Sequence, residues 1–224
     1  MRRFLSAGIT LSALTLVLGT ATASQAQTFD FTGGLGTGTT AYTATAAPSG
    51  NTATGTYRIV TNVTQFNTNL VQPLGGTASG GNFLVFDGST VAGTNLFSFT
   101  TTAATSGFYN FSFYGAAGGS PVPTFAASFG VGSTAPNTTT SLGSVVATNT
   151  WSQFTSSNFS LTAGTTYTFT ILDSSTVGGG NDGAIDDVKL TLVTASTAAP
   201  EPGSLALLLP VMGTVGMMLR RRKK

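Results

Sequence analysis

The chain has 224 residues, with nine Lys and Arg, seven Asp and Glu, and neither His nor Cys. Catalytic triads that use His, metal sites built on His or Cys, and disulfides are therefore excluded. Only 7% of the residues are charged, but 41% are hydrophobic and 16 are Phe, which favours a folded core over disorder. The length fits one domain with appended segments.

The basic residues gather at the two ends of the chain. Arg2 and Arg3 open it, and residues 220–224 are all Arg or Lys. The stretch between them contains only Arg58 and Lys189 as bases, against six Asp. A nucleic-acid groove needs clustered Lys and Arg to displace counterions, so we expect no nucleic-acid partner.

Residues 1–26 have the layout of a secretory signal peptide. A positive start precedes the apolar run Phe4–Leu18, and the small residues up to Ala26 offer cleavage sites. We expect cleavage after Ala26. The alternative is an uncleaved membrane helix, but the run is shorter than the roughly 20 residues that a bilayer requires. Export also suits a chain without Cys, because no thiol is left to mispair.

The C-terminal segment, residues 200–224, has three consecutive parts. Its motif Pro-Glu-Pro is followed by the apolar run Ser204–Leu219 and then by the basic cluster. A helix over this run would be about 24 Å long, which is marginal for a hydrocarbon core about 30 Å thick. The positive-inside rule keeps the basic cluster cytoplasmic. We therefore expect transient membrane insertion through this helix, with the body across the membrane.

This three-part segment resembles the PEP-CTERM sorting signal of Gram-negative bacteria. The resemblance implies recognition by an exosortase, a membrane-embedded cysteine protease-transpeptidase, with cleavage near the Pro-Glu-Pro motif. It also implies release or attachment at the cell exterior, often in bacteria that form biofilms or secrete exopolysaccharide. The sorting and processing residues would be Pro200, Glu201, Pro202, Arg220, Arg221 and Arg222. The alternative is a permanent single-span tail anchor.

Residues 27–194, followed by a linker at 195–199, read as an all-β body. Apolar residues alternate with Thr and Ser, so that Tyr167, Phe169 and Ile171 are expected to face inward and the intervening Thr to face water. Strands are predicted at 28–31, 56–61, 82–87, 96–101, 107–114, 125–130, 144–147, 153–161 (broken), 166–172 and 184–193. Short strands separated by Gly, Ser and Asn turns predict an antiparallel two-sheet β-sandwich.

Four segments of this body resemble a galactose-binding-like jelly roll, the fold of many carbohydrate-binding modules. They are residues 81–88 (GNFLVFDG), 107–113 (GFYNFSF), 164–169 (GTTYTF) and 184–190 (AIDDVKL). The order of all four carries the resemblance, since none is decisive alone. It implies a jelly-roll sandwich with a glycan connection; without it, a plain sandwich remains.

The pair Asp186-Asp187 is out of phase with its strand. Counting back by twos from Leu192 places Asp186 on the inward face, so either a bulge shifts the register or a carboxylate points into the sandwich. A buried carboxylate needs a cation or several N–H donors. We therefore weigh a bulge with hydrogen-bonded Asp side chains against a structural Ca²⁺ site, with Asp182 and Asp30 as further oxygen donors. No other cofactor is predicted.

Trp151 is the sole Trp and a candidate glycan-binding residue, with a core anchor as its alternative role. A glycosidase would need two carboxylates flanking one bond, but adjacent residues of a strand such as Asp186 and Asp187 point to opposite faces. We expect no enzyme. The favoured function is an exported, non-catalytic surface or matrix protein with a structural or adhesive role in biofilm or exopolysaccharide. The alternative is a dedicated carbohydrate-binding module with a defined glycan site.

Overall fold

The computed structural model describes residues 26–46, 52–73, 81–132, 140–175 and 181–195. Apart from Ala26, the predicted signal peptide lies outside these residues, as does the predicted sorting segment 200–224. Within the described ranges the chain is almost entirely β-strand, with one 3-10 helix, η1 (Val63–Gln65). No helix in these ranges has the length and apolar character to span a membrane. The predicted all-β class is confirmed.

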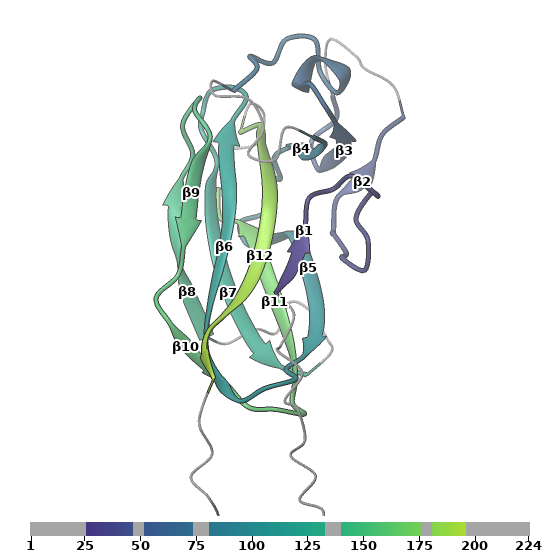
Figure 1. The fold of residues 1–224 in the computed structure, drawn as a ribbon. Coiled ribbons are helices and arrows are strands. Elements are labelled where there is room, and N and C mark those ends of the chain that lie inside the picture. The colour runs from purple at the N-terminus through teal and green to yellow at the C-terminus, as the bar shows by residue number, and fades with distance from the viewer. Residues whose placement is uncertain (1–25, 47–51, 74–80, 133–139, 176–180, 196–224) are drawn as a thin grey trace, which may run out of the picture.

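The strands form two sheets (Figure 1). Sheet A holds β1 (Gln27–Phe29), β2 (Thr43–Ala44), β3 (Thr56–Val60), β4 (Phe83–Asp87), β6 (Gly107–Ala117), β9 (Ser152–Thr155), β10 (Phe159–Leu161) and β12 (Gly183–Ala195). Sheet B has the order β5 (Thr94–Thr102), β11 (Thr166–Asp173), β7 (Thr124–Val131), β8 (Thr140–Val146). Neighbouring strands are antiparallel, except that β2 runs parallel to β3.

Aromatic rings from the two sheets meet in one core, which makes the fold a sandwich. Phe111 of β6 stacks on Phe169 of β11 with 5.5 Å between ring centroids, and Phe113 contacts Phe125 of β7 edge-on at 5.9 Å. Tyr109 packs into the same core. Burying one such side chain contributes about 1.5–3 kcal/mol, so these rings stabilise the contact between the sheets. The inward faces predicted from the alternation are confirmed.

The prediction that the Thr residues of β11 face water is wrong for Thr168 and Thr170. Both are buried, at 3% and 0% exposure, on the side of sheet B that faces away from the core. β11 is a central strand, flanked by β5 and β7. Thr168 shares a hydrogen bond with Thr100 of β5 and donates one to the carbonyl of Gly132, the residue that follows β7. Neighbouring strands, rather than water, satisfy this hydroxyl.

A second apolar cluster covers the outer side of one end of sheet A. Val60, Phe83, Val85 and Ala184 alternate with core-facing residues, and so point away from the sandwich. The chain between β3 and β4 folds over them and buries Val63, Phe66 and Leu70. A capping box at Asn62 and Gln65 fixes η1 there. This end of sheet A is therefore covered on both faces.

A bulge interrupts β12 at Asp186 and Asp187, as one of the two sequence interpretations predicted. The register with β6 shifts between Asp186 and Lys189, and Asp187 has a φ of 49°. Asp is one of the few residues besides Gly that adopt this left-handed conformation at modest cost. The bulge lies between the stretch of β12 paired with β4 and the stretch paired with β1. It returns Val188 and Leu190 to the core.

The observed strands lie close to the predicted ones, with four differences that bear on the loops and the linker. β6 continues to Ala117, three residues into a predicted loop, and β8 begins at Thr140 rather than Ser144. β2 lies within the segment predicted as a loop. β12 ends at Ala195, the first residue of the predicted linker.

Candidate functional site

The half of sheet A that segment 61–72 leaves uncovered presents polar side chains around one exposed aromatic ring. We call it the open face; in Figure 1 its strands β9, β6, β12 and β1 lie toward the viewer. Its register places side chains from four neighbouring strands and β10 on one side. They are Phe108, Asn110 and Tyr114 of β6, Gln153 and Thr155 of β9, Ser160 of β10, Lys189 and Thr191 of β12, and Thr28 of β1.

Phe108 is the prominent feature of the open face. It is 51% exposed, because it precedes Tyr109 on β6 and therefore points to the opposite side of the sheet. Ser160 lies directly across from it on β10, and Asn110 follows on the same side of β6. Tyr114 stands on the same face about 20 Å further along the strand. An apolar ring flanked by hydroxyl and amide groups can stack on a sugar and hydrogen-bond to its rim.

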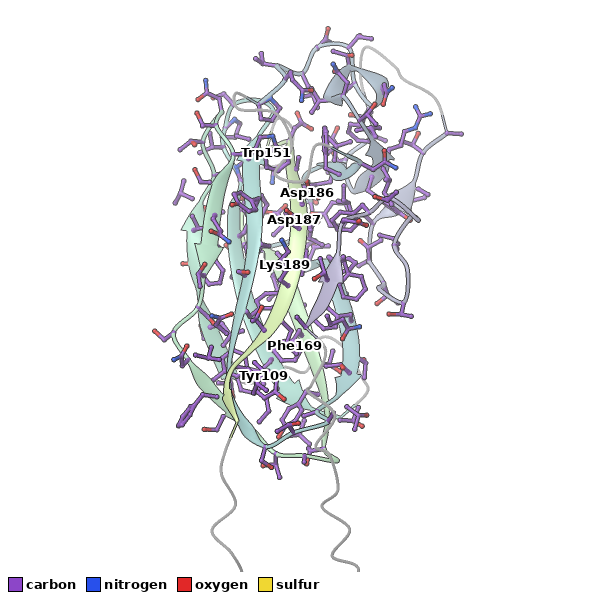
Figure 2. All side chains as sticks on the ribbon, viewed as in Figure 1. Tyr109, Trp151, Phe169, Asp186, Asp187 and Lys189 are labelled. Carbon is purple, nitrogen blue, oxygen red and sulfur yellow. The ribbon has the colours of Figure 1, made fainter. Side chains whose placement is uncertain are left out.

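Lys189 is the one base among the residues of the open face, and a neighbouring carboxylate balances its positive charge. The Lys189 ammonium lies 3.5 Å from the Asp187 carboxylate, and the bulge brings the two together on β12. Figure 2 shows Asp186, Asp187 and Lys189 in sequence along this strand. Asp186 is fully buried, and its carboxylate accepts a hydrogen bond from the Asp187 amide at 2.7 Å. The face therefore suits a neutral ligand better than a polyanion.

A buried polar cluster lies near the start of β12, where β4 and β11 end. Asp173, 0% exposed, accepts hydrogen bonds at one oxygen from the Tyr42 hydroxyl (3.0 Å), the Ser89 amide (3.2 Å) and the Asn181 side-chain amide (3.1 Å). Two effects raise the pKa of the Tyr42 hydroxyl well above its ordinary range: burial, which is the larger, and the negative charge of Asp173. The hydroxyl therefore stays protonated as a donor.

Two further carboxylates, Asp87 and Asp182, stand beside this cluster, each 7% exposed. Burial, and then the charge of Asp87, raises the pKa of Asp182 to about 7. Burial also raises the pKa of Asp87, although a 2.8 Å hydrogen bond from Thr52 opposes the shift. The sequence analysis singled out Asp182 but not Asp87, because Asp87 ends β4, Asp182 precedes β12, and only the fold brings these two strands together.

The structure does not bring the four predicted calcium ligands together. Asp30 is exposed and lies in a shallow hollow of about 280 Å³ formed by residues 27–37, where its carboxylate accepts the Thr32 amide at 3.1 Å. Asp186 and Asp187 belong to the bulge, and Asp182 precedes β12. In the described part of the chain, no three acidic side chains are grouped so that they could hold a metal ion. A calcium site built on the original four residues stays a prediction.

Trp151 lies beside the second apolar cluster. It is partly buried, and its ring meets Phe83 edge-on at 5.4 Å between centroids. Its indole N–H is buried and has no hydrogen-bond partner. This placement agrees with the packing alternative raised in the sequence analysis, while the glycan-binding role of Trp151 stays a prediction. Figure 2 shows Trp151 toward the opposite end of the body from Tyr109.

Comparison with known proteins finds no matching family model and no matching curated protein. Among solved structures, the xylan-binding domain of family CBM22 is similar at 14% identity over 80% of this chain and 99% of that one, with a TM-score of 0.46. The C-terminal family 22 module of Clostridium thermocellum Xyn10B matches at 14% identity over 77% and 96%, with a TM-score of 0.46.

A third similar structure is the CBM22-1–GH10 fragment of C. thermocellum xylanase 10B with xylohexaose, at 16% identity and a TM-score of 0.40. The match takes in 53% of this chain but only 23% of that one. With TM-scores below 0.5, these structures assign no family to the chain.

Proposed function

We propose that this chain is an exported, non-catalytic β-sandwich that binds a neutral polysaccharide on the open face. The observation that carries the proposal is Phe108, a half-exposed ring on a β-strand whose Tyr109, Phe111 and Phe113 are turned into the core. Phe is among the residues enriched at the centres of binding interfaces, where a flat apolar surface meets the partner.

The surroundings of Phe108 favour a sugar over an apolar partner. Asn110, Ser160 and Thr191 offer amide and hydroxyl groups on the same side of the sheet, with both donor and acceptor capacity. Sugar hydroxyls also donate and accept, so these groups can satisfy a glycan without burying an unpaired charge. The Lys189–Asp187 pair leaves no uncompensated cation there to attract an acidic polymer.

The location of this binding follows from the terminal segments. Export by the signal peptide and processing by an exosortase at Pro200–Pro202 would deliver the sandwich to the cell surface or the extracellular matrix. A glycan-binding body there would contact exopolysaccharide. Glycan binding would then also account for the adhesive role that was predicted from the sequence. A purely structural role in the matrix, without glycan binding, is the competing function.

Retention on polysaccharides tests this proposal. Secreted wild-type protein is applied to insoluble xylan, cellulose and chitin and, by affinity electrophoresis, to soluble neutral and acidic polysaccharides. We expect binding to at least one neutral polymer and a loss of about tenfold in Phe108→Ala, equivalent to about 1.4 kcal/mol. The control is Val131→Ala, which removes a 77% exposed side chain from sheet B.

Two outcomes contradict the proposal. Equal retention of Phe108→Ala and the wild type would remove the open face as the binding surface. Binding to no isolated polysaccharide, combined with loss of matrix in a deletion strain, would favour the structural role.

A further inference from the structure

The strand β8 forms one edge of sheet B. It lies at the end of the strand order, where it pairs with β7, and Figure 1 shows it on the left side of the body. Within the described ranges, no backbone hydrogen bond joins its other side to a further strand or loop. Five of its seven residues are exposed. Such an edge presents N–H and C=O groups that can pair with another strand.

The opposite edge of sheet B, at β5, is covered by the chain itself. Thr39 exchanges two backbone hydrogen bonds with Ser98, and the amide of Ala41 donates to the carbonyl of Asn95. The segment that follows β1 therefore satisfies part of the edge at β5. Among the described strands of sheet B, β8 is the one whose edge lacks such a cover.

The distribution of charge also distinguishes β8. No Asp, Glu, Lys or Arg occurs between Asp87 and Asp173, a stretch that contains β5, β6, β7 and β8 and most of β11. The strand β8 contains no Pro either. Folded proteins commonly protect an edge strand from pairing with other chains by a Lys, a Pro or a bulge. Of these three devices, β8 has only the bulge.

The bulge confines the free edge to the second half of β8. Ser141 and Gly143 are paired with consecutive residues of β7, so Leu142 is the extra residue. A bulge bends the strand and interrupts its ladder. From Gly143 to Val146 the pairing with β7 is regular, so this stretch can accept a further strand.

The ladder shows which backbone groups of this stretch are free. The amide of Ala147 donates to the carbonyl of Pro123, which precedes β7, and therefore points toward that strand. In an antiparallel pair, the backbone groups of successive residues point alternately toward the partner strand and away from it. The amide and carbonyl groups of Ser144 and Val146 therefore point to the open edge.

We propose that two copies of this chain associate by antiparallel pairing of their β8 strands about a two-fold axis at Val145. In this register, Ser144 of each copy lies opposite Val146 of the other. Each of these two pairs exchanges two backbone hydrogen bonds, and the two copies of sheet B become one continuous sheet. The pairing also covers part of Val146, which is 58% exposed.

The composition of β8 favours a second copy as the occupant of this edge. A two-fold axis brings each strand next to its own counterpart, so a charged edge strand would repel itself. The strand β8 has only small polar and aliphatic side chains, and a charged partner would find no complementary charge on it. This contact lies on sheet B, whereas the proposed glycan site lies on sheet A, so the two proposals are independent.

Sedimentation of the secreted protein over a range of concentrations tests the association. We expect the average mass to rise with concentration from that of one chain toward that of two. Val146→Lys places like charges on both sides of the axis and should weaken dimerisation by at least about tenfold. Val131→Lys adds the same charge at a 77% exposed position of β7 and is the matched control, which should dimerise as the wild type does. Phe108→Ala should also dimerise as the wild type does.

Disulfide formation tests the register of the two strands. The chain has no Cys, so a thiol introduced at one position can form a disulfide only with a second copy. A mixture of Ser144→Cys and Val146→Cys should give a linked heterodimer, because opposed residues lie within the Cα separation that a disulfide requires. Either variant alone should link far less. This measurement decides the question even where Val146→Lys alters the fold.

Three results would overturn the proposal. One is a wild type that stays monomeric at millimolar concentration. The second is dimerisation that Val146→Lys and Val131→Lys affect equally, which would assign the contact to another surface. The third is linkage of each Cys variant alone that equals the linkage in the mixture.

Discussion

Phe108 and Tyr109 are consecutive residues of β6 that lie on opposite faces of sheet A. Phe108 is 51% exposed, whereas Tyr109 is 2% exposed and donates its hydroxyl to the Thr105 carbonyl at 2.7 Å. One aromatic ring therefore serves the surface and its neighbour serves the core. The two positions can be separated by substitution.

Tyr109→Ala should lower the free energy of unfolding by about 3–5 kcal/mol, because it removes a buried ring and leaves a cavity. Tyr109→Phe should cost only about 0.5–1.5 kcal/mol, the net value of one hydrogen bond. Phe108→Ala should change stability by less than about 0.5 kcal/mol. Guanidinium denaturation measures all three. A destabilisation by Phe108→Ala as large as that by Tyr109→Ala would show that Phe108 is also a core residue.

The positive φ of Asp187 in the bulge predicts that the stability of the fold depends strongly on the residue type at this position. Asp187→Asn retains a side chain that tolerates positive φ and loses an ion pair of which only the Lys189 end is exposed, so stability should change by less than about 1 kcal/mol. Asp187→Val places a β-branched residue at this φ and should cost about 1–3 kcal/mol. Thermal unfolding of both variants checks this. Equal effects would mean that the ion pair with Lys189, not the backbone, holds the bulge.

Stability should depend on pH through Asp182. Its pKa is about 7 in the folded chain, above the ordinary carboxyl value, so the folded state holds a proton that the unfolded state releases. Without divalent cations, Tm should therefore fall as the pH rises from about 4 to about 7 and change little above that range. The charged group that faces Asp182 is Asp87, at the end of β4.

Asp182→Asn should flatten this pH profile, since the amide does not titrate, and Asp30→Asn should leave it unchanged. A Tm that rises between pH 4 and 7 in the metal-free wild type would contradict the assignment.

Trp151 offers a test of packing against ligand contact. Trp151→Ala should lower the free energy of unfolding by about 2–4 kcal/mol through the lost contact with the second cluster, and Trp151→Phe should recover most of it. The indole N–H has no partner, so Phe loses no hydrogen bond. Stability is measured alongside polysaccharide retention. Lost retention at unchanged stability would instead support the sugar contact.

The two terminal segments predict the mass of the mature protein. Intact mass spectrometry of protein collected outside the cells should show a chain that begins at Gln27 and ends near Pro200–Pro202, with or without an attached group. Detection of Lys223 and Lys224 in that material would contradict exosortase processing. A chain found only in the inner membrane with both lysines would favour the tail anchor.

The local pattern of the sequence predicted most strands and the inward rings, because alternation with period two is a property of each strand by itself. It also located the irregularity at Asp186-Asp187. β2 was not predicted, because a strand of two residues paired with β3 is too short to show an alternation. Phe108 carried a usable signal: it is an aromatic residue out of phase with Tyr109, Phe111 and Phe113 on its own strand.

The partners of Asp182 could not be found in this way. Asp87 reaches it only through the pairing of β4 with β12, and Asn181 acquires its orientation from Asp173 on the other sheet. Registers between distant segments depend on the whole fold, so side chains that are brought together by them leave no motif in the sequence. The calcium site predicted from the sequence at Asp30, Asp182, Asp186 and Asp187 stays a prediction; of these residues, Asp30 follows the pair of Phe29 with Val188 and so comes next to Asp187.

The place of β12 within sheet A has a mechanical consequence. Its hydrogen-bonded ladder to β6 runs from Gly183 to Ala195, and its other edge is held first by β4 and then by β1. If the chain were attached to a surface through the residues after Ala195, flowing water that pulls on the cell would apply tension at this end of β12. The tension would act along the strand. The ladder is then sheared with many hydrogen bonds sharing the force, instead of being peeled apart one bond at a time. Such a strand suits a tether.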